Sequence, residues 1–196
     1  MHGVPMAPPR IEVAGATYHI NGKAVHGVKL FADESDRQLF LRLFAREAHH
    51  SDWCVLTYSL MTTHYHALLR LEKPTLSSGF QRLNSLYARL YNRRHNRRGA
   101  LWQRRFYDVM VESESHLYET IRYIALNAPR AGATDDPHAW PWSNYGSAIG
   151  LAPRGDLGDD RELLRLFGTR RDVAMKRLRA YVEELDPRGR LSQTRV

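Results

Sequence analysis

The spacing of apolar residues predicts alternating strands and helices in the first half of the chain. Residues 17–25 alternate loosely between apolar and polar side chains, which indicates a strand. Over residues 33–49 the apolar positions recur every three or four residues, as on one side of a helix. Residues 52–61 are rich in aromatic and β-branched side chains and predict a second strand. A two-residue connection then leads into a third strand at residues 64–71.

The second half continues this pattern. A long helix is predicted over residues 75–94 and a fourth strand over residues 105–111. Ser113 is expected to cap a further helix that runs to about Asn127, and Pro129 is expected to stop it. The order of these elements predicts an α+β fold with a ferredoxin-like core, an antiparallel sheet with helices packed on it.

The ends of the chain differ from this core. Residues 1–10 contain three prolines and predict an irregular N-terminal arm. Residues 11–150 are expected to form the main domain. Beyond it, two helical patterns at residues 160–167 and 172–185 predict a helical C-terminal extension over residues 156–196. A chain of 196 residues is long enough for one domain with a core and such an extension.

Composition and charge narrow the choice of partners. The hydrophobic content of 43% and charged content of 26% are ordinary for a soluble globular protein. A net charge of +8 favours a polyanionic partner, because binding to phosphates releases counterions. The single cysteine, Cys54, excludes a disulfide framework within one chain and is expected to be a small buried side chain. Without a signal-peptide pattern or a long apolar run, the protein is expected to be cytoplasmic and not membrane-bound.

A basic stretch rich in aromatic residues is the first candidate functional feature. Between Leu90 and Tyr107 no acidic residue occurs, whereas arginines and aromatic rings alternate. Basic residues beside aromatic rings suit single-stranded nucleic acid, because they neutralise the backbone and stack on bases. The alternative is a solvated helix end.

The second candidate is the pair His64 and His66. Alternate residues of a strand face the same side, so two histidines two positions apart point together while Tyr65 points away. Two imidazoles on one side of a strand can share a metal ion. The alternative is a pair of surface histidines on an exposed sheet.

The third candidate is Tyr123 with Asn127. Four residues apart on a helix, they share one face. A tyrosine can act as a covalent nucleophile, and a nearby metal helps by stabilising the phenolate. The alternative is a packed tyrosine followed by an asparagine that caps the helix.

Five segments together resemble the insertion-sequence-type, single-tyrosine transposases with an HUH motif, especially the REP-associated tyrosine transposases. The resemblance spans about residues 9–145 in the expected order. The segments are 61–69 (MTTHYHALL), 82–95 (RLNSLYARLYNRRH), 101–107 (LWQRRFY), 122–132 (RYIALNAPRAG) and 140–145 (WPWSNY).

The resemblance implies a chemistry and a set of site residues. Tyr123 would attack a phosphodiester of single-stranded or hairpin DNA and leave a 5′-phosphotyrosine. His64 and His66, with Asn127 as third ligand, would hold Mg²⁺ or Mn²⁺. The side chains expected to contact DNA are Arg10, Arg82, Arg89, Arg93, Arg94, Arg97, Arg98, Trp102, Arg104, Arg105, Arg122 and Arg130. A monomer is expected, with a homodimer as the alternative. The competing function is a domesticated protein that binds hairpin DNA without productive cleavage.

The chain departs from the family pattern at four places. Thr62-Thr63 replaces the usual Pro-Asn before the first histidine, and Ala125 replaces a histidine after the tyrosine. Asn127 is followed by Ala-Pro in place of Pro-Val, and residues 21–24 (NGKA) replace a Ser/Thr-Arg-Gly-Asn sequence. None of these changes removes a predicted ligand or the nucleophile, but the last lies where the family approaches DNA.

Overall fold

The computed structural model describes residues 11–184, so the predicted arm with Arg10 and the last residues of the predicted extension lie outside the described residues. Four strands form one sheet in the order β2-β3-β1-β4, with every neighbouring pair antiparallel. The strands are β1 (Thr17–Lys23), β2 (Trp53–Leu60), β3 (His64–Leu71) and β4 (Tyr107–Met110). The predicted α+β fold is therefore confirmed.

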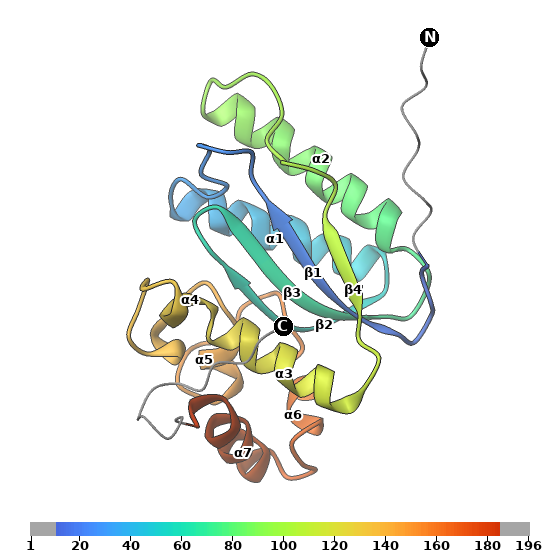
Figure 1. The fold of residues 1–196 in the computed structure, drawn as a ribbon, viewed down its shortest axis with the longest axis vertical. Helices are drawn as coiled ribbons and strands as arrows, with labels where there is room; N and C mark the ends of the chain where they lie inside the picture. Colours follow the sequence, from blue (N-terminus) through green and yellow to red (C-terminus); the bar gives the residue numbers. More distant parts are fainter. Residues whose placement is uncertain (1–10, 185–196) are drawn as a thin grey trace.

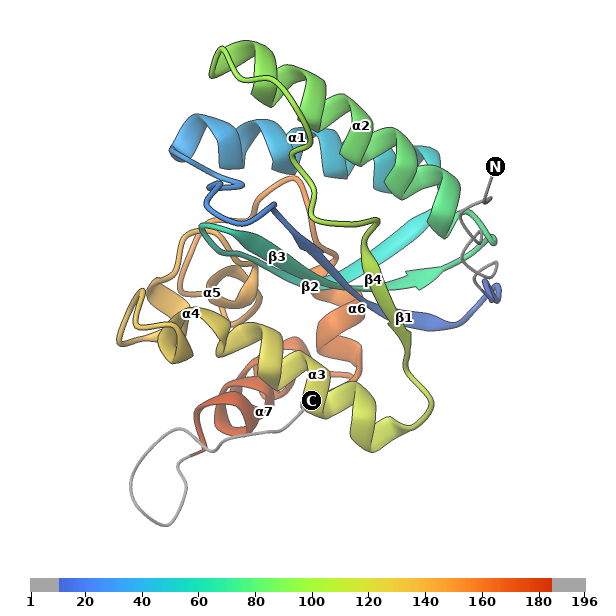
Figure 2. The same cartoon turned by 45° about the horizontal axis from the view of Figure 1, so that its top comes forward.

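Helices cover both faces of this sheet (Figures 1 and 2). The first face carries α1 (Glu34–His50) and α2 (Leu76–Arg94), which lie side by side. The remaining helices gather on the second face. They are α3 (Glu114–Ala125), α4 (Asn127–Arg130), α5 (Tyr145–Ala148), α6 (Asp160–Arg165), α7 (Arg171–Glu183) and the 3₁₀ turn η1 (Pro137–Ala139).

Strand alternation divides the side chains between the two faces. Tyr18 and Ile20 of β1 and Tyr65 of β3 are buried in the core beneath α1 and α2, among aromatic rings such as Phe40. The intervening positions of the same strands face α3, where Leu68 joins a second apolar core. Each face of the sheet is thus buried, and the polar residues of β1 and β3 all fall on the α3 side.

The C-terminal helices share the second core with α3. Leu164 of α6 and Leu178 and Val182 of α7 are buried with Ile121 and Ile124 of α3. These helices therefore hold α3 from the side that faces away from the sheet.

The segment before α5 runs along the outer edge of the sheet. The Leu60 N–H donates to the Trp142 carbonyl at 2.9 Å, and the Trp140 indole N–H donates to the Leu60 carbonyl at 3.2 Å. This segment thus pairs with part of the β2 edge, which would otherwise expose unpaired backbone groups.

Several predicted boundaries shift for local reasons. Ser113 caps α3 as predicted, since its hydroxyl accepts from the His116 N–H at 3.2 Å. The helix ends at Ala125, however, and α4 follows at once with Pro129 inside its single turn, where the missing N–H costs little. The fourth strand is shorter than predicted, because the residues before Tyr107 form a loop in which Trp102 bridges to Ala24.

Candidate active site

Two histidines and an asparagine meet on the second face of the sheet. His64 and His66 project from β3 toward α3, with their ring centroids 5.2 Å apart and nearly perpendicular. Tyr65 between them is fully buried on the opposite face, as strand alternation requires. The Asn127 side chain, at the start of α4, hydrogen-bonds to His64. His64 and Asn127, which are 63 positions apart in sequence, thus belong to one polar cluster.

Burial keeps these imidazoles neutral. Removal from water lowers the pKa of His64, although the hydrogen bond between His64 and Asn127 opposes this shift. Burial also lowers the pKa of His66 to about 2, with smaller contributions from the neighbouring His19 and His64. Neutral imidazoles offer lone pairs, which is the form in which histidine binds a metal ion.

The Tyr123 ring stands beside this cluster. It lies edge-on to His66 with centroids 5.2 Å apart, and 5.8 Å from the ring of His19. The Arg130 guanidinium carbon lies 5.6 Å from the centroid of the Tyr123 ring, so a positive charge faces the phenol. The half-buried Tyr123 ring thus lies between two imidazoles and a guanidinium.

A pocket of about 450 Å³ opens onto the tyrosine. Its lining comes from three strands and α3. The lining residues are His19, Asn21, His66, Tyr107, Val109, His116, Glu119 and Tyr123. The pocket is large enough to admit a phosphodiester group next to both the phenol and the His66 ring.

Sequence reasoning missed His19 and Asn21 as site residues. Asn21 pairs with His66 in the β1–β3 register, and its side-chain nitrogen lies 3.5 Å from each ring nitrogen of His66. A signal was present, because these two polar residues alternate with the apolar Tyr18 and Ile20. The strand order that brings them to β3, however, is not contained in that local pattern.

The predicted DNA-contacting arginines fall into two groups. The exposed group lies along α2 and in the loop before β4, and consists of Arg89, Arg93, Arg98, Arg104 and Arg105. The Arg104 guanidinium carbon lies 5.3 Å from the centroid of Tyr107, a residue that also lines the pocket at Tyr123. Arg104 therefore places one member of this group next to the pocket.

The other arginines have partners within the chain. Arg82 pairs with Glu47 at 2.6 Å, and the buried Arg122 hydrogen-bonds to the carbonyl of Glu184. Arg97 folds back onto the carbonyl of Ala100 at 2.7 Å.

Trp102, which was also predicted to contact DNA, packs against the core of the protein. Its indole N–H donates to the Asn84 carbonyl at 2.9 Å, and its half-buried ring packs near Phe40 and Tyr65.

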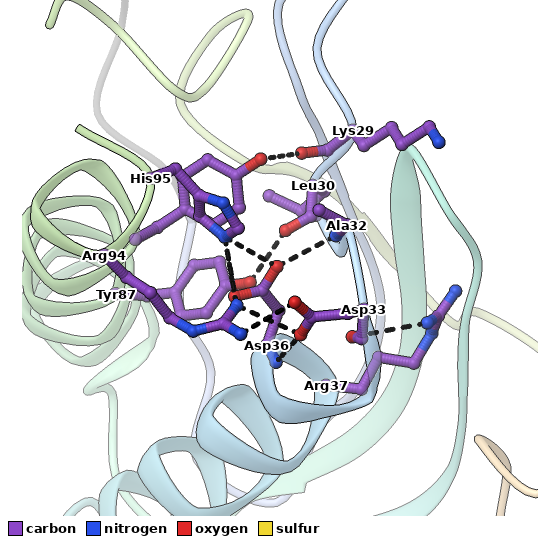
Figure 3. A network of polar contacts seen from close by, with 10 residues as sticks. Lys29, Leu30, Ala32, Asp33, Asp36, Arg37, Tyr87, Arg94 and His95 are labelled. Carbon is purple, nitrogen blue, oxygen red and sulfur yellow. Dashed lines mark hydrogen bonds and ion pairs between the residues drawn. The ribbon is translucent and has the colours of Figure 1, made fainter. Parts of the chain in front are cut away.

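Arg94 belongs to a polar network that joins α2 to α1 (Figure 3). Its guanidinium contacts Asp36 at 2.6 Å and Asp33 at 2.7 Å. His95 also contacts Asp36 at 3.0 Å, and the Ala32 N–H donates to the same carboxylate at 2.9 Å. Asp33 in turn caps α1 by accepting from the Asp36 N–H.

Three residues of this network, Asp33, Asp36 and His95, have side-chain atoms close enough together to hold a metal ion. Arg94 already neutralises both carboxylates, and the network fastens the start of α1 to the end of α2. It lies at the start of α1 and the end of α2, on the first face of the sheet, whereas Tyr123 lies on the second (Figure 2). We therefore assign it a structural role.

A four-stranded antiparallel sheet that sets a histidine pair beside a helical tyrosine is the arrangement expected for a single-tyrosine transposase. Sequence comparison agrees, since residues 12–127 match the family Transposase IS200 like. This match covers more than half of the chain. The protein therefore belongs to the IS200-like transposase family, and the predicted resemblance is confirmed.

Solved structures show the same fold. The structure of the REP-associated tyrosine transposase bound to a REP hairpin matches with a TM-score of 0.64 and 16% identity, over 79% of this chain and 94% of that chain. The tRNA(His) guanylyltransferase of Saccharomyces cerevisiae covers 90% of this chain and 82% of its own, with 10% identity and a TM-score of 0.47, too low to support a conclusion. No curated protein matches significantly in sequence. Within residues 11–184, none of the helices combines the length and hydropathy needed to cross a membrane.

Proposed function

We propose that this protein nicks and rejoins single-stranded DNA at hairpin-forming repeats, with Tyr123 as the nucleophile. The observation that carries the proposal is the Tyr123 ring 5.2 Å from His66, at a pocket next to the exposed arginines of the β4 edge. A protein that used this surface for binding alone would have no need of a phenol beside buried, neutral imidazoles.

The reaction exchanges one phosphate ester for another. The Tyr123 oxygen forms a bond to the phosphorus and loses its proton, while the bond from phosphorus to the 3′ oxygen breaks and that oxygen takes up a proton. The products are a 5′-phosphotyrosine and a free 3′-hydroxyl. Because the covalent link conserves the ester bond, the reverse attack by a 3′-hydroxyl rejoins DNA without ATP. The Arg130 guanidinium carbon lies 5.6 Å from the centroid of the Tyr123 ring, and its positive charge would offset part of the negative charge that develops during this step.

His64, His66 and Asn127 fit a divalent metal ion. The two imidazoles are neutral, they share one face of β3, and the Asn127 amide already contacts His64. Mn²⁺ accepts imidazole ligands readily, whereas Mg²⁺ prefers oxygen, so we expect activity with Mn²⁺ at least as high as with Mg²⁺. When bound, the ion acts as a Lewis acid on a non-bridging phosphate oxygen.

We further propose that DNA reaches the pocket along the exposed arginines. Arg104 and Arg105 line a groove of about 540 Å³ between α2 and the loop before β4. Both side chains are exposed, and Arg104 also contacts Tyr107 at the pocket. Arginines of this kind hold the DNA backbone without reading its sequence. The protein works as a monomer in this proposal, since His66 and Tyr123 already meet within one chain.

A covalent-adduct assay tests the proposal. Labelled single strands from the DNA that flanks the gene are incubated with the protein and Mn²⁺ or Mg²⁺, and adducts that survive denaturing gel electrophoresis are counted. We expect an adduct with the unaltered protein and none with Tyr123→Phe, which keeps the ring and its packing. His64→Ala should also abolish cleavage while it leaves salt-sensitive DNA binding largely intact. Tight hairpin binding without an adduct on any flanking sequence would refute cleavage and favour the binding-only alternative.

A further inference from the structure

A direct contact between two buried histidines is not used by the proposed reaction. The His19 Nε2 and His66 Nδ1 atoms lie 3.0 Å apart, and the two side chains are only 8% and 3% exposed. The rings are tilted by 34° with centroids 5.1 Å apart, so the contact joins ring edges and is not a stack. At this distance one nitrogen must carry a proton and the other must accept it.

Both rings are almost fully buried, which disfavours the charged form of each. Each neutral ring therefore has one N–H and one lone pair, and the shared proton decides which nitrogen of each ring is free. If His19 donated, His66 would carry its proton on Nε2 and could not bind a metal ion through that atom. If His66 donates, its Nε2 lone pair is free.

We propose that His19 is a positioning residue for His66: its Nε2 accepts the Nδ1–H of His66 and so leaves the Nε2 lone pair of His66 to the metal ion. This inference rests on the proposed metal site. A ligating histidine commonly donates its other ring N–H to a fixed acceptor, which sets its tautomer and its orientation. In this chain that acceptor is another histidine.

The sheet makes His19 a rigid acceptor. It belongs to β1, which is hydrogen-bonded to β3 on one side and to β4 on the other. In the register, His19 pairs with Leu68 and Asn21 pairs with His66, so His19 is the diagonal neighbour of His66. The centroid of the Tyr123 ring lies 5.8 Å from that of the His19 ring. The same strand pairing therefore fixes the acceptor, the ligand and the side of the sheet that the nucleophile approaches.

The first test is nuclear magnetic resonance on the unaltered protein without metal. Long-range proton–nitrogen spectra of the histidine rings distinguish the two neutral tautomers. We expect His66 to carry its proton on Nδ1 and His19 to carry its proton on Nδ1 as well, with its Nε2 as acceptor. A His66 ring protonated on Nε2 would overturn the inference, and this measurement needs no variant.

The second test compares two substitutions by Mn²⁺ titration calorimetry. In His19→Gln the amide oxygen can still accept from His66, so affinity should remain close to that of the unaltered protein. His19→Leu fills the space without an acceptor, and we expect Mn²⁺ binding to weaken about 10- to 100-fold. His50→Gln, on the exposed end of α1, is the matched control and should bind as the unaltered protein does.

The outcomes separate this inference from the proposed function. If the unaltered protein and folded His19→Leu bind Mn²⁺ and cleave DNA equally well, the inference is wrong and the proposed function stands. If the unaltered protein binds no Mn²⁺, the metal site itself is refuted, and the role given to His19 is refuted with it. Thermal unfolding identifies a variant that fails to fold, in which case His19→Gln and the spectra of the unaltered protein decide.

Discussion

Replacement of Asn144 by alanine should destabilise the protein more than most single substitutions do. Its buried side chain hydrogen-bonds to the backbone at a β-bulge in β2, where the register shifts between Val55 and Thr57. The amide oxygen accepts from the Tyr58 N–H at 3.1 Å and from the Thr57 hydroxyl at 3.0 Å. The amide nitrogen donates to the Leu56 carbonyl at 3.0 Å. One side chain thus satisfies backbone groups that the bulge removes from the ladder.

The expected loss follows from the groups left unpaired. Asn144→Ala leaves the Tyr58 N–H and the Leu56 carbonyl without this hydrogen-bond partner. Each buried polar group without a partner lowers the free energy of unfolding by about 1–3 kcal/mol. We therefore expect the free energy of unfolding to fall by about 3 kcal/mol or more, a large part of the total of about 5–15 kcal/mol for a typical domain.

Urea unfolding of the variant and the unaltered protein, with a common slope, measures this difference. Gln103→Ala removes an exposed amide and serves as the control, with a change within about 0.5 kcal/mol. A loss below about 1 kcal/mol for Asn144→Ala would show that water replaces the side chain and that the reasoning is wrong.

Two further predictions concern β1. A Cβ at Gly22 would lie 2.3 Å from the buried Tyr65 ring, so Gly22→Ala should cost about 1–3 kcal/mol and lower Tm by several degrees, whereas Gly155→Ala, with ordinary contacts at its Cβ, should not. In the metal-free protein, burial lowers the pKa of His19 to about 4, whereas in the unfolded chain the imidazole has its ordinary pKa of about 6.5. As the pH falls below about 6.5, the unfolded chain therefore binds a proton on His19 before the folded chain does. Stability should therefore decrease between pH 6.5 and 4, by up to about 1.4 kcal/mol per pH unit from this residue. Urea unfolding across that range should give a shallower slope for His19→Gln, and an unchanged slope would contradict the predicted effect.

Local patterns were enough to predict most elements and part of the site. Strand alternation separates His64 and His66 from Tyr65, and the hydroxyl of Ser113 marks the start of α3. Long-range pairing could not be predicted in this way. His19 reaches His66 because β1 lies between β3 and β4, a consequence of how three distant segments pair.

The ion pairs of the arginines could not be predicted from local sequence patterns either. Composition marks the stretch around α2 as basic, but it cannot tell which guanidinium meets a carboxylate. Arg94 contacts Asp36, 58 residues away, because α1 and α2 lie side by side on one face of the sheet (Figure 2). Arg104, ten residues later, contacts the Tyr107 ring at the pocket. The fold thus divides one basic segment into a part that joins two helices and a part whose arginines are exposed.

The position of Tyr123 depends on both sides of α3. Consecutive residues on this helix point in different directions, so Tyr123 contacts His66 while Arg122 turns toward the C-terminal helices. There the Arg122 guanidinium carbon lies 5.5 Å from the Tyr181 ring centroid, and the guanidinium donates to the carbonyl of Glu184. The buried apolar side chains of α3 and α7 reinforce this contact. Because the sheet holds the imidazoles and α7 holds the helix that carries the phenol, the distance between Tyr123 and the histidines is set by the packing of the whole second core.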